Sequence, residues 1–240
     1  MTEEIPKPMV EIGGQPILWH IMMHYARFGI KDFVVALGYK AEVIKSFFIN
    51  NRNLGSDIHV DLSTGDVEIL SSSRVDWRVS LVDTGLESLT GERLRRLSGF
   101  IGDETFMLTY GDGLSNVNLD KLLSFHRSRD QLATMTAVRP AARFGELRLS
   151  GDLVSSFEEK PQLTDGWING GFFVMEPDFI KLIPNSNVML EKEPFERAVA
   201  KGELSAFRHE GFWQCMDTKR DWEYLNGLWN GGSAPWLKDG

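Results

Sequence analysis

Short continuous apolar runs alternate with amphipathic segments along most of this sequence, and this alternation limits the possible folds more than any other feature. The runs are as long as single strands, and such runs are typical of strands buried on both faces of a parallel sheet. We predict strands at residues 33–37, 79–83, 105–110, 133–138 and 204–209, with another within 167–175. We predict helices at residues 17–25, 41–48, 88–97, 118–126, 194–201 and 219–228. The expected fold is α/β, with a Rossmann-like, mostly parallel but mixed sheet and helices on both faces.

Two further segments have the pattern of antiparallel hairpins. The turn sequences Ser63-Thr64-Gly65-Asp66 and Ser150-Gly151-Asp152 each separate two short runs of strand type. Such turns predict peripheral hairpins near residues 58–70 and 146–157. The length of 240 residues suits one large α/β domain, so we expect residues 1–240 to form a single domain.

The composition restricts the class of function. A net charge of −8 without a dense Lys/Arg run argues against a nucleic-acid partner. No apolar run approaches the length of a membrane span, and the N-terminus lacks a signal-peptide pattern. The single cysteine, Cys215, is consistent with the cytosol, because one cysteine forms no intrachain disulfide. We therefore expect a cytoplasmic protein that acts on small molecules.

The run at residues 105–110 ends at Asp112, which stands between Gly111 and Gly113. In open α/β sheets, ligands bind at the carboxyl ends of strands, and glycines let a bulky group approach the backbone closely. A carboxylate placed there suits a hard cation with phosphate oxygens. The alternative is a simple Asp-Gly hairpin turn. The capped helical pattern at residues 118–126 argues against a returning strand.

Lys7 lies between Pro6 and Pro8 in a stiff N-terminal segment. The prolines fix the neighbouring backbone angles, so we expect neither a helix nor a central strand there. Lys7 is either a phosphate anchor or a solvated surface lysine.

His20 and His24 stand four residues apart on the first predicted helix, which is the spacing of a metal-binding pair. No glutamate or third ligand follows nearby, so we interpret both as packing or surface residues.

Several short motifs occur in a fixed order along nearly the whole chain. They are Pro6-Lys7-Pro8-Met9, residues 10–21, Leu81-Val82-Asp83-Thr84-Gly85, Tyr110-Gly111-Asp112-Gly113, Arg143-Phe144-Gly145, Glu159-Lys160-Pro161, Ile168-Asn169-Gly170-Gly171-Phe172 and residues 212–218. Each motif alone is weak, but together they resemble the sugar-1-phosphate nucleotidylyltransferases. The Trp19-His20 pair, residues 82–85 and the tryptophan-rich C-terminus favour the cytidylyl-transferring subgroup. The resemblance implies a nucleotide-diphospho-sugar transferase type of fold and a homo-oligomer.

The resemblance also implies a reaction, in which glucose 1-phosphate attacks the α-phosphate of CTP to give CDP-glucose and pyrophosphate. The product would feed deoxyhexose synthesis for cell-surface polysaccharide such as the O-antigen of lipopolysaccharide. Asp112 and Asp217 would hold Mg²⁺, Lys7 would neutralise triphosphate charge, and Lys160 would hold the sugar phosphate. A competing interpretation of Asp217 is a cap for the following helix.

The remaining candidate residues bind substrate in this interpretation. Those expected to contact sugar hydroxyls are Glu159, Asn169 and Gly170. Those expected near the base or ribose are Thr84, Gly85 and Gly111, and Arg93 is expected to contact phosphate. The competing interpretation of Glu159 with Lys160 is a solvated turn.

The sequence departs from the family pattern at its beginning. Family members carry an apolar strand and a Gly-rich loop just ahead of the Pro-Lys-Pro segment, and neither precedes Lys7 here. We therefore expect the first strand to be missing, with two inner strands facing an unpaired gap. Either the natural chain starts upstream of Met1, or this is a shortened relative with little catalysis. We expect strongly reduced nucleotidyl transfer by these 240 residues alone.

Two other functions remain as alternatives. The first is a non-catalytic nucleotide- or sugar-phosphate-binding homologue that associates with an intact enzyme. The second is a metal-dependent glycosyltransferase, which is disfavoured because an Asp-x-Asp pair is expected at the strand end, whereas Asp112 stands between glycines.

Overall fold

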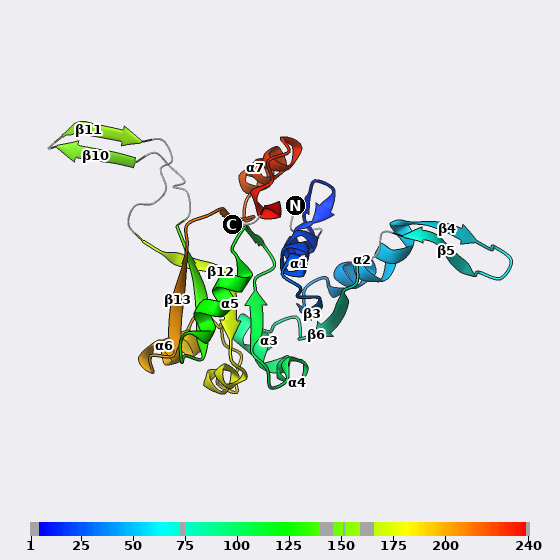
Figure 1. The fold of residues 1–240 in the computed structure, drawn as a ribbon, viewed down its shortest axis with the longest axis horizontal. Helices are drawn as coiled ribbons and strands as arrows, with labels where there is room; N and C mark the ends of the chain where they lie inside the picture. The colour runs from blue at the N-terminus through cyan, green and yellow to red at the C-terminus, as the bar shows by residue number, and fades with distance from the viewer. Residues whose placement is uncertain (1–4, 73–74, 140–145, 151, 159–165, 239–240) are drawn as a thin grey trace.

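The computed structural model describes residues 5–72, 75–139, 146–150, 152–158 and 166–238. Strands and helices alternate along the chain and form one body, from which two hairpins project at opposite ends (Figure 1). The chain therefore has the α/β fold that the sequence predicts. Among the described residues, no helix combines the length and the apolar character needed to cross a membrane.

Among the described residues, the main sheet has four strands and is mixed. Its strands, in spatial order, are β13 (Leu204–His209), β9 (Ala133–Val138), β12 (Ile168–Met175) and β7 (Phe106–Thr109). β9 and β13 are parallel, whereas β12 is antiparallel to both β7 and β9. A second sheet consists of β3 (Asp32–Leu37) and β6 (Arg78–Asp83), which are parallel.

The two sheets are not joined by hydrogen-bonded strands in the described part of the chain. Within the described part of the chain, β3 pairs with β6 and β7 pairs with β12, and neither strand pairs with the other. The sequence predicted that both strands are buried, and this prediction is wrong in part. All four residues of β7 are only partly buried, and Val34 of β3 is 38% exposed. The cause is the unpaired edge, along which no described strand covers these apolar side chains.

Helices cover both faces of the main sheet. The helices of the described chain are α1 (Ile17–Arg27), α2 (Ala41–Leu54), α3 (Thr90–Arg96), α4 (Ser98–Ile101), α5 (Leu119–Arg127), α6 (Glu193–Ala200) and α7 (Lys219–Asn230), of which α2 packs against the smaller sheet instead. Phe172 and Phe173 are consecutive in β12, so their side chains point to opposite faces of the sheet. Phe172 packs in a cluster with residues of α1, α5 and α7, and Phe173 packs in a cluster with residues of α3 and α6. The predicted coverage of both faces is thus confirmed.

The N-terminal segment differs from expectation. Lys7–Met9 form one turn of 3-10 helix, η1, followed by the short strands β1 (Glu11–Ile12) and β2 (Gln15–Pro16). The prediction that the prolines exclude any helix there is wrong, because a proline is tolerated in the first turn, where its missing N–H needs no partner. Other 3-10 helices of the described chain are η2 (Pro177–Leu182) and η3 (Pro235–Leu237).

The two histidines of α1 are packing residues. His20 is buried, its Nε2 lies 2.8 Å from the Ile12 carbonyl oxygen, and the Trp236 indole N–H donates to its Nδ1. His24 is also buried, with Nε2 2.9 Å from the Val117 carbonyl oxygen. The interpretation of this pair as structural is confirmed.

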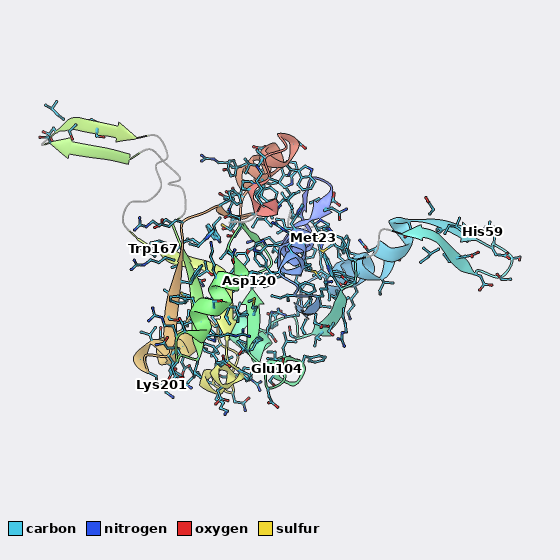
Figure 2. The ribbon with its side chains drawn as sticks, in the orientation of Figure 1. Met23, His59, Glu104, Asp120, Trp167 and Lys201 are labelled. Atoms are coloured by element: carbon cyan, nitrogen blue, oxygen red, sulfur yellow. The ribbon has the colours of Figure 1, made fainter. Side chains whose placement is uncertain are left out.

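Two hairpins project from the body (Figure 1). One consists of β4 (Ser56–Val60) and β5 (Val67–Ser72), and the other of β10 (Glu146–Ser150) and β11 (Leu153–Glu158). His59 of β4 is labelled on the projecting hairpin, far from the side chains that fill the body (Figure 2). The described residues that line the cavities reported below all belong to the body.

Candidate active site

Three distant segments bring Lys7, Asp112 and Asp217 together. Lys7 Nζ donates to Asp112 Oδ2 at 3.1 Å and to Asp217 Oδ1 at 2.7 Å. Lys7 lies in η1, Asp112 follows β7, and Asp217 precedes α7. We call this group the charge cluster.

Backbone pairing beside the charge cluster brings its two carboxylates close. Strands β8 (Gly113–Ser115) and β14 (Trp213–Cys215) are antiparallel, with Gly113 opposite Cys215. The Met216 N–H donates to the Asp112 carbonyl oxygen at 2.8 Å. Because this pairing extends to the ends of both strands, Asp112 and Asp217 are held side by side. The Asp112-Gly113 dipeptide therefore does not form a simple hairpin turn.

The charge cluster is partly open to water, with side-chain exposures of 36% for Lys7, 29% for Asp112 and 40% for Asp217. Partial burial alone would lower the pKa of Lys7. Hydrogen bonds to Asp217 and Asp112, together with their charges, outweigh burial and raise that pKa above the ordinary lysine value. Lys7 is therefore cationic, and it is not the solvated surface lysine of the competing interpretation.

Asp217 does not cap the helix that follows it. Thr218 is the N-cap of α7, and its side chain forms a capping box with Asp221. Asp217 instead contacts Lys7 through Oδ1 and accepts from the Cys215 thiol through Oδ2 at 3.2 Å. Burial, together with this contact, raises the pKa of Cys215 to about 12, so the thiol keeps its proton.

The chemistry of the two carboxylates fits a hard divalent cation. Asp112 and Asp217 already converge on one positive charge, the Lys7 ammonium. In the described part of the chain, no group of three or more His, Cys, Asp or Glu residues could hold a metal ion. Mg²⁺ is commonly held by one or two carboxylates, with phosphate oxygens and water completing its shell. These residues suit an ion that arrives with a phosphate ligand.

Asp112 lines two cavities. The larger, of ≈ 410 Å³, is also lined by Lys7, Gly111 and Arg93, and by Ala36 of β3 and Leu108 of β7. It therefore lies where the two sheets fail to pair. The smaller, of ≈ 170 Å³, is lined by residues that include Asn169, Gly170, Trp213 and Asp217. The charge cluster thus borders both cavities.

Asn169 and Gly170 are fixed at the wall of the smaller cavity. Asn169 Oδ1 accepts from the Gly171 N–H at 2.8 Å, and the Trp213 indole donates to the Gly170 carbonyl oxygen at 2.7 Å. A side chain on Gly170 would lie 3.0 Å from the Thr136 carbonyl oxygen, so the strand leaves no room for one. Their contact with sugar hydroxyls stays a prediction.

Thr84, Gly85 and Arg93 lie at the carboxyl ends of β3 and β6. The buried Thr84 hydroxyl donates to the Leu37 carbonyl oxygen at 2.8 Å, and the Gly85 N–H donates to Asp83. Arg93 Nη1 donates to the Thr84 hydroxyl at 2.6 Å and to the Leu37 carbonyl oxygen at 2.8 Å. These contacts tie α3 to the smaller sheet. The substrate roles of these residues stay predictions.

Glu159 and Lys160 lie outside the described residues, as does the Arg143-Phe144-Gly145 motif. Their predicted contacts with substrate are therefore untested.

One hydrogen-bond network in this region is not predictable from the sequence. Tyr110 donates to Glu191, which also accepts from Thr90, while Asn169 donates to Tyr110. The sequence identifies Tyr110 only as the end of a predicted strand and as part of a motif. Nothing in the sequence pairs it with Glu191, which is 81 residues away.

Comparisons with known proteins identify the family of the chain and proteins of similar fold. A family model described as nucleotidyl transferase matches residues 1–222. A glucose-1-phosphate cytidylyltransferase of Salmonella typhi is 47% identical over 96% of this chain and 90% of its own. A probable glucose-1-phosphate cytidylyltransferase of Bacillus subtilis is 41% identical over 98% of this chain and 92% of its own. A crystal structure of apo UDP-glucose pyrophosphorylase has the same fold, with a TM-score of 0.64, 14% identity and coverage of 95% of this chain and 91% of its own.

Proposed function

The chain belongs to the nucleotidyl transferase family, and we propose that it transfers a cytidylyl group from CTP to α-D-glucose 1-phosphate, forming CDP-glucose and pyrophosphate. The observation that carries the proposal is the meeting of Lys7 with Asp112 and Asp217 at the border of two cavities. The choice of CTP and glucose 1-phosphate is supported by the names of the relatives at 47% and 41% identity.

The reaction needs charge neutralisation and alignment more than a covalent nucleophile. Lys7 neutralises the triphosphate as the negative charge moves to the leaving pyrophosphate. Asp112 and Asp217 would hold Mg²⁺, which when bound supplies further neutralisation between the nucleotide and the incoming sugar phosphate. Lys160 holds the sugar phosphate in this proposal, and Asn169 binds a sugar hydroxyl in the smaller cavity.

The proposal also covers the oligomeric state of the enzyme, its location in the cell and the use of its product. We expect a homo-oligomer in the cytoplasm, whose product feeds CDP-deoxyhexose synthesis for the O-antigen of lipopolysaccharide. The relatives that are named cytidylyltransferases support the CDP-sugar product from which such a pathway would start.

A base-specific turnover assay tests the proposal. The purified chain is incubated with glucose 1-phosphate, Mg²⁺ and CTP, UTP, dTTP or GTP, and pyrophosphate release and the mass of the sugar nucleotide are measured. We expect CDP-glucose as the product, formed at a low rate by these 240 residues, with CTP preferred over the other nucleotides by at least about tenfold. Asp112→Asn should lower turnover by about 100-fold or more. The matched control Asp178→Asn, which removes an exposed carboxylate paired with Lys181, should leave turnover unchanged.

Two results would contradict the proposal. Preference for another nucleotide would overturn the assignment of CTP. Calorimetric binding of both substrates without any product would instead support a non-catalytic binding protein.

A further inference from the structure

A chain of hydrogen bonds leads from the smaller cavity to the start of α3. Asn169 Nδ2 donates to the Tyr110 hydroxyl at 3.2 Å, and that hydroxyl donates to Glu191 Oε1 at 2.5 Å. Glu191 Oε2 accepts from the Thr90 hydroxyl at 2.6 Å, and the Thr90 oxygen accepts from the Leu190 N–H at 2.8 Å. One end of this hydrogen-bond network is therefore fixed on β12 and the other at the start of α3.

Donor and acceptor chemistry gives this network one direction. A carboxylate only accepts hydrogen bonds, so the Tyr110 proton must point to Glu191. The Tyr110 oxygen can then only accept, and Asn169 must turn its NH₂ group towards it. On its other side, Asn169 must present its carbonyl oxygen to the Gly171 N–H, which lies 2.8 Å away. Both constraints select the same orientation of the amide.

Packing of the Tyr110 ring fixes the position of its hydroxyl group in this network. It packs edge-to-face on Phe173, with ring centroids 5.6 Å apart. A Cβ at Gly171 would lie only 2.8 Å from the ring, so the ring and the β12 backbone are in close contact. Tyr110 lines both cavities, and Asn169 lines the smaller one beside Asp112 and Asp217. One Nδ2 hydrogen and one lone pair of the Asn169 amide remain after these contacts.

We propose that Tyr110 and Glu191 are positioning residues, which orient the Asn169 amide so that its remaining donor and acceptor bind a hydroxyl of the sugar phosphate. The inference deepens the proposed function and depends on it. Selectivity for the sugar then depends on four residues, which are Asn169, Tyr110, Glu191 and Thr90. Of these four, only Asn169 contacts the sugar.

The test is calorimetric binding of glucose 1-phosphate and of CTP to wild type and variants. Tyr110→Phe removes the hydroxyl and keeps the ring packing. We expect it to weaken glucose 1-phosphate binding about tenfold, the size of one lost hydrogen bond, while CTP affinity changes less than about twofold. Tyr224→Phe, which removes the hydroxyl of an exposed tyrosine on α7, should change neither affinity.

Two further measurements separate positioning from simple stabilisation. Glu191→Gln replaces one of the two acceptor oxygens of Glu191 with an NH₂ donor, so it should weaken sugar-phosphate binding as well. The double variant Tyr110→Phe with Glu191→Gln should bind no more weakly than the weaker of the two single variants. With a series of monodeoxy glucose 1-phosphates, wild type should lose affinity most for one analogue, and Tyr110→Phe should discriminate less against that analogue.

The outcomes distinguish the inference from the proposed function. Binding of glucose 1-phosphate by wild type and Tyr110→Phe with equal affinity would overturn the inference alone. A parallel loss of affinity for both ligands with a lower Tm would show a structural role and also overturn it. Failure of wild type to bind glucose 1-phosphate would overturn the proposed function and this inference together.

Discussion

Replacing Lys7 with methionine should change metal affinity and turnover in opposite directions. The Lys7 ammonium lies 3.1 Å from Asp112 Oδ2 and 2.7 Å from Asp217 Oδ1. Before nucleotide binds, a divalent cation must share the two carboxylates with this ammonium. Lys7→Met removes the competing charge, so nucleotide-free protein should bind Mn²⁺ or Mg²⁺ more tightly. Turnover should fall, because the triphosphate loses a neutralising cation.

The exposure of the charge cluster limits how much the metal affinity can increase in Lys7→Met. All three side chains are between 29% and 40% exposed, so water and salt screen the two ion pairs. Partly exposed pairs contribute about 0.5–1 kcal/mol each, which gives about 1–2 kcal/mol for both. This range corresponds to metal binding that is about 5- to 30-fold tighter. The loss in turnover should be larger, about 100-fold, because it concerns charge that develops during the reaction.

Titration of Mn²⁺ into nucleotide-free protein, followed by electron paramagnetic resonance, measures the first effect, and pyrophosphate release measures the second. Lys31→Met is a matched control, because Lys31 is also a half-exposed lysine paired with an aspartate, Asp76, away from both cavities. It should leave both quantities unchanged. Unchanged Mn²⁺ affinity in Lys7→Met would refute the idea that ammonium and metal compete for one position. Weaker Mn²⁺ binding would show that Lys7 organises the carboxylates instead.

Two further predictions concern stability, and thermal unfolding measures both. Gly171→Ala should lower the free energy of unfolding by about 2–3 kcal/mol, because its φ of +77° is strained for alanine and the new methyl group would meet the Tyr110 ring. Gly202→Ala has a similar φ of +71° in open space and should cost about 1 kcal/mol, so equal losses would contradict the clash. Burial lowers the pKa of His20 below the ordinary 6.5, so its stabilising contribution is complete above pH 6.5 and is lost as the pH falls through the folded-state value. His20→Gln should therefore flatten the acid side of the stability profile, and His59→Gln on the exposed hairpin should not.

The order and type of most elements could be predicted because their signals are local. An apolar run of strand length or a helical repeat of apolar side chains is visible within ten residues. The capping signal at Asn118 is equally local, and its side chain accepts from the Lys121 N–H as expected. Strand direction is not local. β12 is antiparallel to both of its neighbours. An apolar run of strand length does not indicate in which direction the strand pairs.

The candidate site could be predicted in part for the same reason. Asp112 and Asp217 were recognised as members of motifs, and the pairing of β8 with β14 accounts for their proximity in the fold. The role of Glu191 had no local signal, because a glutamate on a charged segment is ordinarily a solvated residue. Its contacts with Thr90 and Tyr110 span 101 and 81 residues. Side-chain networks of this range depend on the packing of complete elements, which residue spacing does not encode.

The structure gives a second physical reason for a glycine at position 111. The sequence suggested that glycine beside Asp112 lets a ligand approach the backbone. In the structure, a Cβ at Gly111 would lie 2.9 Å from the Pro8 ring, so the close neighbour is the N-terminal segment of the chain itself. The absence of a side chain lets η1 pack against the end of β7, and this packing brings Lys7 within hydrogen-bonding distance of Asp112. The stiffness of the Pro-Lys-Pro segment and the glycine beside the carboxylate therefore serve one purpose, because together they assemble the charge cluster before any ligand binds.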